Sequence, residues 1–191
     1  SARPSLAAPM MRSMRDEMQV AIRGHDADYV ELRIEDLDET RISYRGRDLE
    51  DIGRSTSGGG CARAYVRGAW GFVTFTRLDD LRGKVALAVR QAHLARGEGG
   101  QLVRSDAVER LLPESNGSTI GEADPLRIPL DQKVGLMNEY VEAQWTVPEV
   151  QSTSLGYGDQ RRMVRFANSD GSYIEQERVD VSFSANSIAL K

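Results

Sequence analysis

The apolar residues of this chain recur at two different spacings, and this change of period restricts the fold more than any other feature. Three stretches have the spacing of an amphipathic helix: about Pro9 to Gly24, Asp79 to Gly97 and Leu130 to Trp145. Between and after them, apolar and polar residues alternate, which is typical of half-buried strands. Short strands with tight turns favour an antiparallel meander. We therefore expect an α+β fold in which antiparallel sheets are flanked by about three helices.

The expected strands fall into two groups. In the first half they cover residues 28–35, 41–44, 61–66 and 70–75, with an acidic turn at 36–39 and a glycine-rich connection at 53–60. In the second half they cover residues 150–157, 162–167 and 179–185, with a turn from Asn168 to Gly171. Each half therefore resembles a helix plus a meander. An internal duplication would explain this pattern, and so would the ordinary recurrence of antiparallel α+β units.

A long loop separates the two halves. Residues 98–124 show no period and are rich in Gly, Ser and Glu, so we expect a linker or long loop there. The expected segments are 1–97 (helix, antiparallel meander and helix), 98–124, and 125–191 (helix plus antiparallel strands). Because the alternation is still running at Ile188, we expect the segments to form one N-terminal domain of a longer protein, cut within a strand at Lys191.

Charge and cysteine content exclude several classes of protein. The chain has 25 Lys+Arg and 29 Asp+Glu, a net charge of −4, so its surface offers no general attraction to nucleic acid or anionic membranes. Its single cysteine, Cys61, allows neither an intrachain disulfide nor a cysteine metal cluster, and favours a reducing compartment. No apolar run is long enough to span a bilayer. We expect a soluble, cytoplasmic protein without nucleic-acid or membrane partners.

The residues that usually carry catalysis are few and scattered. The only histidines, His25 and His93, lack the spacing of a zinc motif, and neither is close to Cys61 in sequence. Cys61 therefore has no adjacent base to activate it. A Gly-x-Ser-x-Gly motif is absent. We expect no catalytic, cofactor-binding or metal-binding residue in this chain.

One segment, Gly53 to Gly60, has the composition of a phosphate-binding loop. It lacks the phosphate-binding motifs, however, and a strand follows it where those motifs require a helix N-terminus. Two interpretations remain: a connection in which glycine lets backbones approach closely, or a recognition segment whose backbone pairs with an extended peptide or partner. The contact residues of the second interpretation are Arg54, Gly58, Gly59, Gly60, Arg63 and Trp70. For Trp70, core packing is the alternative.

An ordered set of short motifs resembles a known family. Tyr29-Val30-Glu31-Leu32-Arg33 and the hairpin at 41–50 are followed by Gly58-Gly59-Gly60-Cys61-Ala62-Arg63 and Gly68-Ala69-Trp70-Gly71-Phe72. Later motifs are Asp124-Pro125, Pro129-Leu130-Asp131-Gln132-Lys133 and Ala167-Asn168-Ser169-Asp170-Gly171. From about Met14 onward the chain is similar to the N-terminal domain of the TldD/PmbA family, zinc metallopeptidases once called modulators of DNA gyrase.

The resemblance implies a domain that assists catalysis without performing it. Peptidase-type members carry His-Glu-x-x-x-His and a later Cys in a C-terminal domain, so zinc is expected there and no family catalytic residue falls within this chain. Members form homodimers, or heterodimers with a paralogue, that enclose a chamber and cleave unfolded peptide segments. We therefore expect this domain to wall the chamber, to position peptide, and to contact its own C-terminal domain. The alternative is the zinc-free PmbA/TldE-type partner, or a stand-alone binding module without enzymatic activity.

Overall fold

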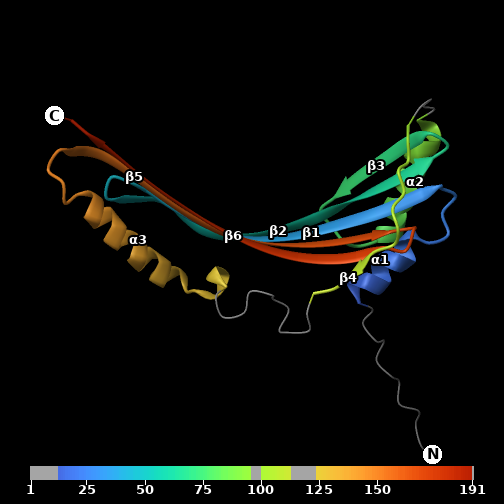
Figure 1. The fold of residues 1–191 in the computed structure, drawn as a ribbon, viewed down its shortest axis with the longest axis horizontal. Coiled ribbons are helices and arrows are strands. Elements are labelled where there is room, and N and C mark those ends of the chain that lie inside the picture. The colour runs from blue at the N-terminus through green and yellow to red at the C-terminus, as the bar shows by residue number, and fades with distance from the viewer. Residues whose placement is uncertain (1–12, 96–99, 113–123, 191) are drawn as a thin grey trace, which may run out of the picture. The chain divides into compact units, whose positions relative to one another are not determined.

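The structure is a computed structural model that describes residues 13–95, 100–112 and 124–190. Its helices are α1 (Met14–Ile22), α2 (Leu81–Leu94) and α3 (Leu130–Gln144), and a short 3-10 helix, η2, covers Pro125–Arg127. The strands are β1 (Tyr29–Arg45), β2 (Asp48–Val66), β3 (Ala69–Phe75), β4 (Glu109–Arg110), β5 (Val150–Asn168) and β6 (Tyr173–Ala189). They form a six-stranded, mostly antiparallel sheet in the order β3-β2-β1-β5-β6-β4 (Figure 1). The expected α+β class is confirmed.

The chain divides into two compact units that are not contiguous in sequence. Unit 1 comprises the described residues within Ser1–Arg33, Gly60–Glu109 and Phe166–Ile174. Unit 2 comprises those within Ile34–Gly59, Arg110–Arg165 and Glu175–Lys191. The four long strands each contribute one part to each unit. The division into 1–97, 98–124 and 125–191 stays a prediction.

Unit 1 consists of two helices and its part of the sheet. The first helix begins after Ser13, whose Oγ accepts the Asp16 N–H at 3.2 Å and so satisfies one free donor of the first turn. α1 packs against α2, and α2 packs against β3. Met18, Leu32 and Val85 are completely buried. Removal of such apolar side chains from water is the main stabilising contribution to this unit.

Gly71 of β3 sets how closely α2 approaches the sheet. A Cβ atom at Gly71 would overlap the Ala88 carbonyl oxygen and would lie 2.6 Å from the Ala92 nitrogen. The helix begins one residue later than predicted, because Asp80 rather than Asp79 is the N-cap: its Oδ1 accepts the Gly83 N–H at 2.9 Å. The predicted start of the first helix, near Pro9, and the predicted end of the second, at Gly97, both lie outside the described residues.

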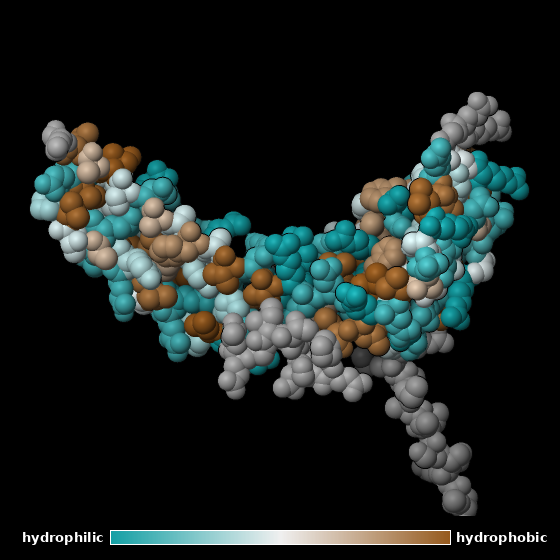
Figure 2. Space-filling model, in the orientation of Figure 1, coloured by the Kyte–Doolittle hydropathy of each residue, from teal (hydrophilic) through white to brown (hydrophobic). Residues whose placement is uncertain are grey.

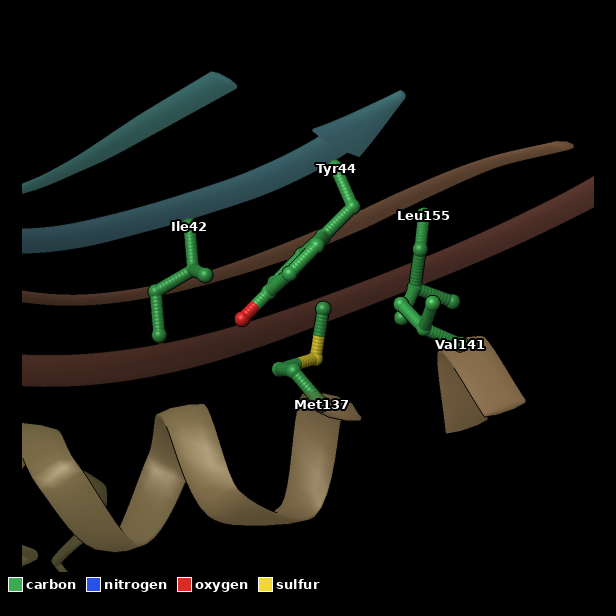
Figure 3. Packing of buried hydrophobic residues seen from close by; sticks show 5 residues of the cluster. All are labelled: Ile42, Tyr44, Met137, Val141 and Leu155. Atoms are coloured by element: carbon green, nitrogen blue, oxygen red, sulfur yellow. The ribbon is translucent and has the colours of Figure 1, made fainter. Parts of the chain in front are cut away.

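Unit 2 is built around α3, which lies along one face of its strands (Figure 1). The helix covers Leu130–Gln144, close to the predicted range, and ends before Pro148. Figure 3 shows the core between helix and sheet, whose members are Ile42, Tyr44, Met137, Val141 and Leu155. The Tyr44 hydroxyl points toward α3 and donates to Asn138 Oδ1 at 2.6 Å. A buried phenol is thus satisfied by the helix that covers it.

The predicted acidic turn at residues 36–39 is wrong, because β1 runs through it without interruption. Each carboxylate has a cross-strand partner. Thr56 Oγ1 donates to Asp38 Oδ1 at 2.7 Å, and Ser55 Oγ donates to Glu39 Oε1 at 3.1 Å. Asp36 pairs with Arg165 at 2.8 Å. The acidic residues at 36–39 would favour a turn by themselves. Their partners on neighbouring strands keep them in an extended conformation instead.

The prediction of a glycine-rich connection at residues 53–60 is also wrong, because the chain continues through it as a strand. These residues form the middle of β2, which is one continuous strand from Asp48 to Val66. Likewise, the strands expected at 150–157 and 162–167 are one strand, β5. The predicted turns around Gly46, Gly68 and Asn168–Gly171 are confirmed. Strand length was underestimated because pairing with neighbours overrides the local preferences of Gly, Asp and Ser.

Candidate functional site

The contact residues predicted from sequence lie on one strand and its hairpin partner, in both units. Arg54 and Gly58 belong to unit 2, and Gly60, Arg63 and Trp70 belong to unit 1. In unit 1, β2 and β3 pair antiparallel, with Arg63 opposite Phe72 and Tyr65 opposite Trp70. Arg63 and Trp70 are brought into direct contact. The predicted contact residues therefore form two separate groups, one in each unit.

In unit 1, an aromatic cluster surrounds the Arg63 guanidinium. Its central carbon lies 4.4 Å from the centre of the Trp70 ring, and its Nη1 lies 3.0 Å from Glu31 Oε1. The Trp70 ring also packs against Tyr65, at 5.1 Å between centroids, and edge-on against Tyr29 at 6.1 Å. Trp70 thus packs against side chains of its own unit, and the role of Arg63 and Trp70 in peptide contact stays a prediction. The guanidinium of Arg63 lies over one face of the Trp70 ring in a cation–π contact.

Tyr29 is the most strongly perturbed group in this cluster. Burial, and then the hydrogen bond from its hydroxyl to Glu31 Oε2 at 2.8 Å, raise its pKa from about 10 to about 12. A phenolate here would be desolvated and would face a carboxylate. At neutral pH the hydroxyl is therefore protonated and donates its hydrogen bond to Glu31.

Glycine at position 60 allows close packing of the β2 backbone. A Cβ atom there would lie 2.5 Å from the Arg33 carbonyl oxygen and 2.7 Å from the Phe75 ring. At Gly58 the added atom would meet Asp36 Oδ1 at 3.0 Å. The close-approach interpretation of the glycines is correct for Gly60. It does not extend to Gly53, where an added Cβ meets nothing within 4 Å.

In unit 2, the first half of β2 lies at the edge of the sheet. Its neighbour β3 pairs only with Gly60–Val66, so Asp48 to Gly58 have β1 on one side and no described strand on the other. These eleven residues are all exposed. Arg54 Nη2 donates to the Ile128 carbonyl at 2.6 Å, which fastens the segment before α3 to this edge. The backbone of the edge remains accessible to an added strand.

The surface beside Arg54 is hollowed. A pocket of about 290 Å³ is lined by three arginines, two carboxylates and their neighbours: Asp38, Glu39, Arg54, Ser55, Thr56, Leu126, Arg127 and Arg161. Arg161 contacts the fully buried Asp124 and lies 3.3 Å from Glu177, so its charge is largely neutralised within the protein. Arg127 lies 3.7 Å from the same Asp124. The pocket therefore has mixed polarity without a strong net charge.

A second buried ion pair lies beneath the start of α3. Lys133 Nζ contacts Asp159 Oδ2, and both side chains are almost inaccessible. The Tyr157 hydroxyl donates to the same carboxylate oxygen at 2.5 Å. Burial raises the pKa of Tyr157, and the Asp159 carboxylate adds to this effect. Sequence reasoning missed this pair, although Asp159 continues the inward-facing alternation of Leu155 and Tyr157.

The described residues do not fit a metal site. Within 13–95, 100–112 and 124–190, no three His, Cys, Asp or Glu side chains are placed so that they could hold a metal ion. His25 Nε2 is 2.9 Å from the Ala21 carbonyl at the end of α1, and His93 Nε2 is 3.1 Å from the Asp26 carbonyl. In the same ranges, no helix is long and apolar enough to cross a membrane.

Comparison with known proteins points to one family. Residues 30–93 match the family model described as PmbA/TldA metallopeptidase domain 1, and residues 123–191 match its metallopeptidase central domain. The chain is 28% identical over 151 residues to a metalloprotease of Synechocystis sp., covering 78% of this chain and 32% of that protein. It is 25% identical over 163 residues to a metalloprotease of Methanothermobacter thermautotrophicus, covering 85% and 34%. The chain thus spans about a third of these relatives.

Solved structures share the fold at low sequence identity. A Bacteroides thetaiotaomicron protein named for modulation of DNA gyrase aligns with a TM-score of 0.74 and 15% identity, covering 92% of this chain and 41% of that one. TldE from Thermococcus kodakarensis aligns with a TM-score of 0.68 and 11% identity, covering 93% and 39%. At these identities the likeness concerns the fold alone.

Proposed function

The chain belongs to the PmbA/TldD family of metallopeptidases, and we propose that it forms the N-terminal, non-catalytic part of such an enzyme. It walls part of a proteolytic chamber and presents unfolded peptide to a catalytic domain elsewhere in the protein, where zinc is held. Its partners are that domain and a second subunit, identical or paralogous. A cytoplasmic location fits the single cysteine, Cys61, because the sequence holds no second cysteine for an intrachain disulfide.

The exposed outer edge of β2 in unit 2 is the observation that carries the peptide-binding role. Over Asp48 to Gly58 the strand is paired on one side only, among the described residues, and every residue is exposed. An extended peptide can add to such an edge through backbone hydrogen bonds, which makes recognition independent of sequence. This property suits a domain that handles unfolded segments.

The side chains along this edge favour pairing over a short central stretch. Ser55, Thr56, Ser57 and Gly58 are uncharged and small, and the Ser55 and Thr56 hydroxyls are occupied by Glu39 and Asp38 of β1. Arg54 stands at one end of this stretch and is tied to Ile128. Charges on an edge strand limit permanent association. The edge is therefore suited to transient binding of a peptide.

Fluorescence anisotropy with a labelled, neutral, unstructured peptide tests this role. We expect binding, and we expect a peptide of the same sequence with alternate backbone amides N-methylated to bind at least about tenfold more weakly, because it cannot form the ladder. Equal binding of the two peptides would contradict strand addition.

Two proline variants locate the edge that binds. Neighbouring residues direct their N–H groups to opposite sides of a strand, so only one of Ser57→Pro and Gly58→Pro removes a donor from the outer edge. That variant should lose peptide binding while keeping its folded circular dichroism spectrum. If both variants bind as the wild type does, the contact lies elsewhere.

A further inference from the structure

The β2 edge that we propose for peptide binding has a hollow on each face of the sheet. The helix-side hollow is the pocket of about 290 Å³ beside Arg54, whose guanidinium donates to the Ile128 carbonyl just before α3. The open-side hollow has a volume of about 150 Å³ and is lined by Glu39, Arg41, Asp51, Gly53, Arg54 and Ser55. Gly53 keeps it open, since an added Cβ there would meet nothing within 4 Å.

The two hollows lie on opposite faces because neighbouring residues of a strand point in opposite directions. Thr56 donates to Asp38 at 2.7 Å beside the helix-side hollow, whereas Ser55 donates to Glu39 at 3.1 Å beside the open-side hollow. The side chains of an extended peptide added to this edge alternate in the same way. Two consecutive residues of the peptide would therefore enter different hollows.

The charges nearest to an added peptide are those of β2 itself. Arg54 and Asp51 lie on this strand, so their Cβ atoms would be about 5 Å from those of the peptide residues directly opposite. Asp38, Glu39 and Arg41 also line the hollows, but they belong to β1, which lies about 4.8 Å further from the added strand. Glu39 and Arg41 moreover pair with each other at 3.7 Å. In Figure 2 hydrophilic residues predominate where Figure 1 labels β2, so a ligand here meets polar groups more than apolar area.

These two β2 charges are not neutralised by the part of the chain that the structure describes. Among those residues Arg54 donates to a backbone carbonyl and has no ion-pair partner, and Asp51 has none either. The other guanidinium groups of the helix-side hollow differ, because Arg127 and Arg161 both lie beside the buried Asp124. The helix-side hollow therefore presents a positive charge to the edge, and the open-side hollow presents a negative one.

We propose that the β2 edge prefers extended peptides in which an acidic residue stands directly next to a basic one. The acidic side chain enters the helix-side hollow and pairs with Arg54, and the basic side chain enters the open-side hollow and pairs with Asp51. This preference rests on the proposed peptide-binding role. Backbone pairing supplies binding to any extended peptide, and the two hollows add selectivity through alternate side chains.

Three labelled peptides of equal length test this preference by fluorescence anisotropy. The first is neutral, the second has Glu-Lys at its centre, and the third has Glu-Ser-Lys, which carries the same charges but places both on one face of the strand. At low salt the Glu-Lys peptide should bind with a Kd at least about threefold below those of the other two, because it alone forms both exposed ion pairs. At about 1 M salt, which screens exposed charges, the difference should disappear.

Single substitutions on β2 assign the preference to its two charges. Arg54→Gln and Asp51→Asn each remove one charge, and each should abolish most of the difference between the Glu-Lys and Glu-Ser-Lys peptides. Arg54→Lys keeps the charge and should keep the preference. Asp48→Asn is the matched control, because Asp48 lies on the same strand but lines neither hollow. The neutral peptide should bind all four variants as it binds the wild type.

The results for the neutral peptide separate this preference from the binding role on which it rests. If the neutral peptide binds and the Glu-Lys and Glu-Ser-Lys peptides bind equally well, the charge preference is overturned while strand addition stands. A preference that persists in both Arg54→Gln and Asp51→Asn also overturns it, because other charges would then be responsible. If no peptide binds at all, the binding role fails and the preference fails with it.

Discussion

Arg63 and Trp70 form the closest cation–π contact in the described chain, with the guanidinium carbon 4.4 Å from the ring centre. The same guanidinium pairs with Glu31 at 3.0 Å, so three side chains from three strands are held together. The contact fixes the face of Trp70 that a ligand would otherwise use for stacking. We therefore expect the contact to contribute to the stability of unit 1.

Replacing Arg63 with methionine should lower the free energy of unfolding by about 1 kcal/mol, since a partly exposed cation–π contact contributes about that much. The methionine keeps most of the apolar stem but loses the charge. Urea unfolding monitored by circular dichroism measures the change. Arg178→Met, at a site where the exposed guanidinium pairs with its neighbour Asp180, is the control and should change stability by less than about 0.5 kcal/mol. Equal effects of the two would show that the ring contact contributes nothing.

The raised pKa of Tyr29 predicts a loss of stability in alkali. The folded-state pKa of about 12 lies above the unfolded value near 10, so the stabilisation is complete below pH 10 and disappears as the pH rises to about 12. Its size is on the order of 3 kcal/mol, from two pKa steps of about 1.36 kcal/mol each. Tyr29→Phe should show a shallower decline between these pH values. Unfolding curves that fall in parallel for both proteins would contradict this assignment.

The buried pair of Lys133 and Asp159 predicts an asymmetric response to mutation. Lys133→Met leaves a buried carboxylate without its counter-ion and should cost about 3–5 kcal/mol of stability. The double variant Lys133→Met/Asp159→Asn should be more stable than Lys133→Met alone, because no unpaired charge remains. Chemical denaturation of the two variants and the wild type tests this order. A double variant that is less stable than the single one would indicate a different source of the loss.

The close approach of α2 to β3 predicts a large effect of a single methyl group. Gly71→Ala places Cβ against the Ala88 carbonyl and should destabilise unit 1 by about 1–3 kcal/mol through overpacking. Gly53→Ala is the matched control in another strand, because the added Cβ meets nothing within 4 Å. Thermal unfolding should place Gly71→Ala well below the wild type and Gly53→Ala close to it. Similar midpoints for the two variants would show that α2 can move away at little cost.

The amino-acid sequence by itself determined the three helices, the α+β class and the tight turns. The helical stripe from Leu130 to Trp145 identified α3 almost to the residue, since an amphipathic period reports which face is buried. The ordered motifs around Gly68–Phe72 and Asn168–Gly171 identified the family. These features depend on local chemistry, which the order of residues specifies directly.

Only the tertiary structure decided the length of the strands and the surroundings of the candidate residues. Asp38 and Glu39 favour a turn locally, yet they remain in β1 because Thr56 and Ser55 donate to them from β2. In the same way, the ring of Trp70 packs against Tyr65 and Arg63. Such contacts join residues far apart in sequence. The free energy of these contacts outweighs the local preference of Asp, Ser and Gly for turns. The spacing of residues along the chain does not predict such contacts.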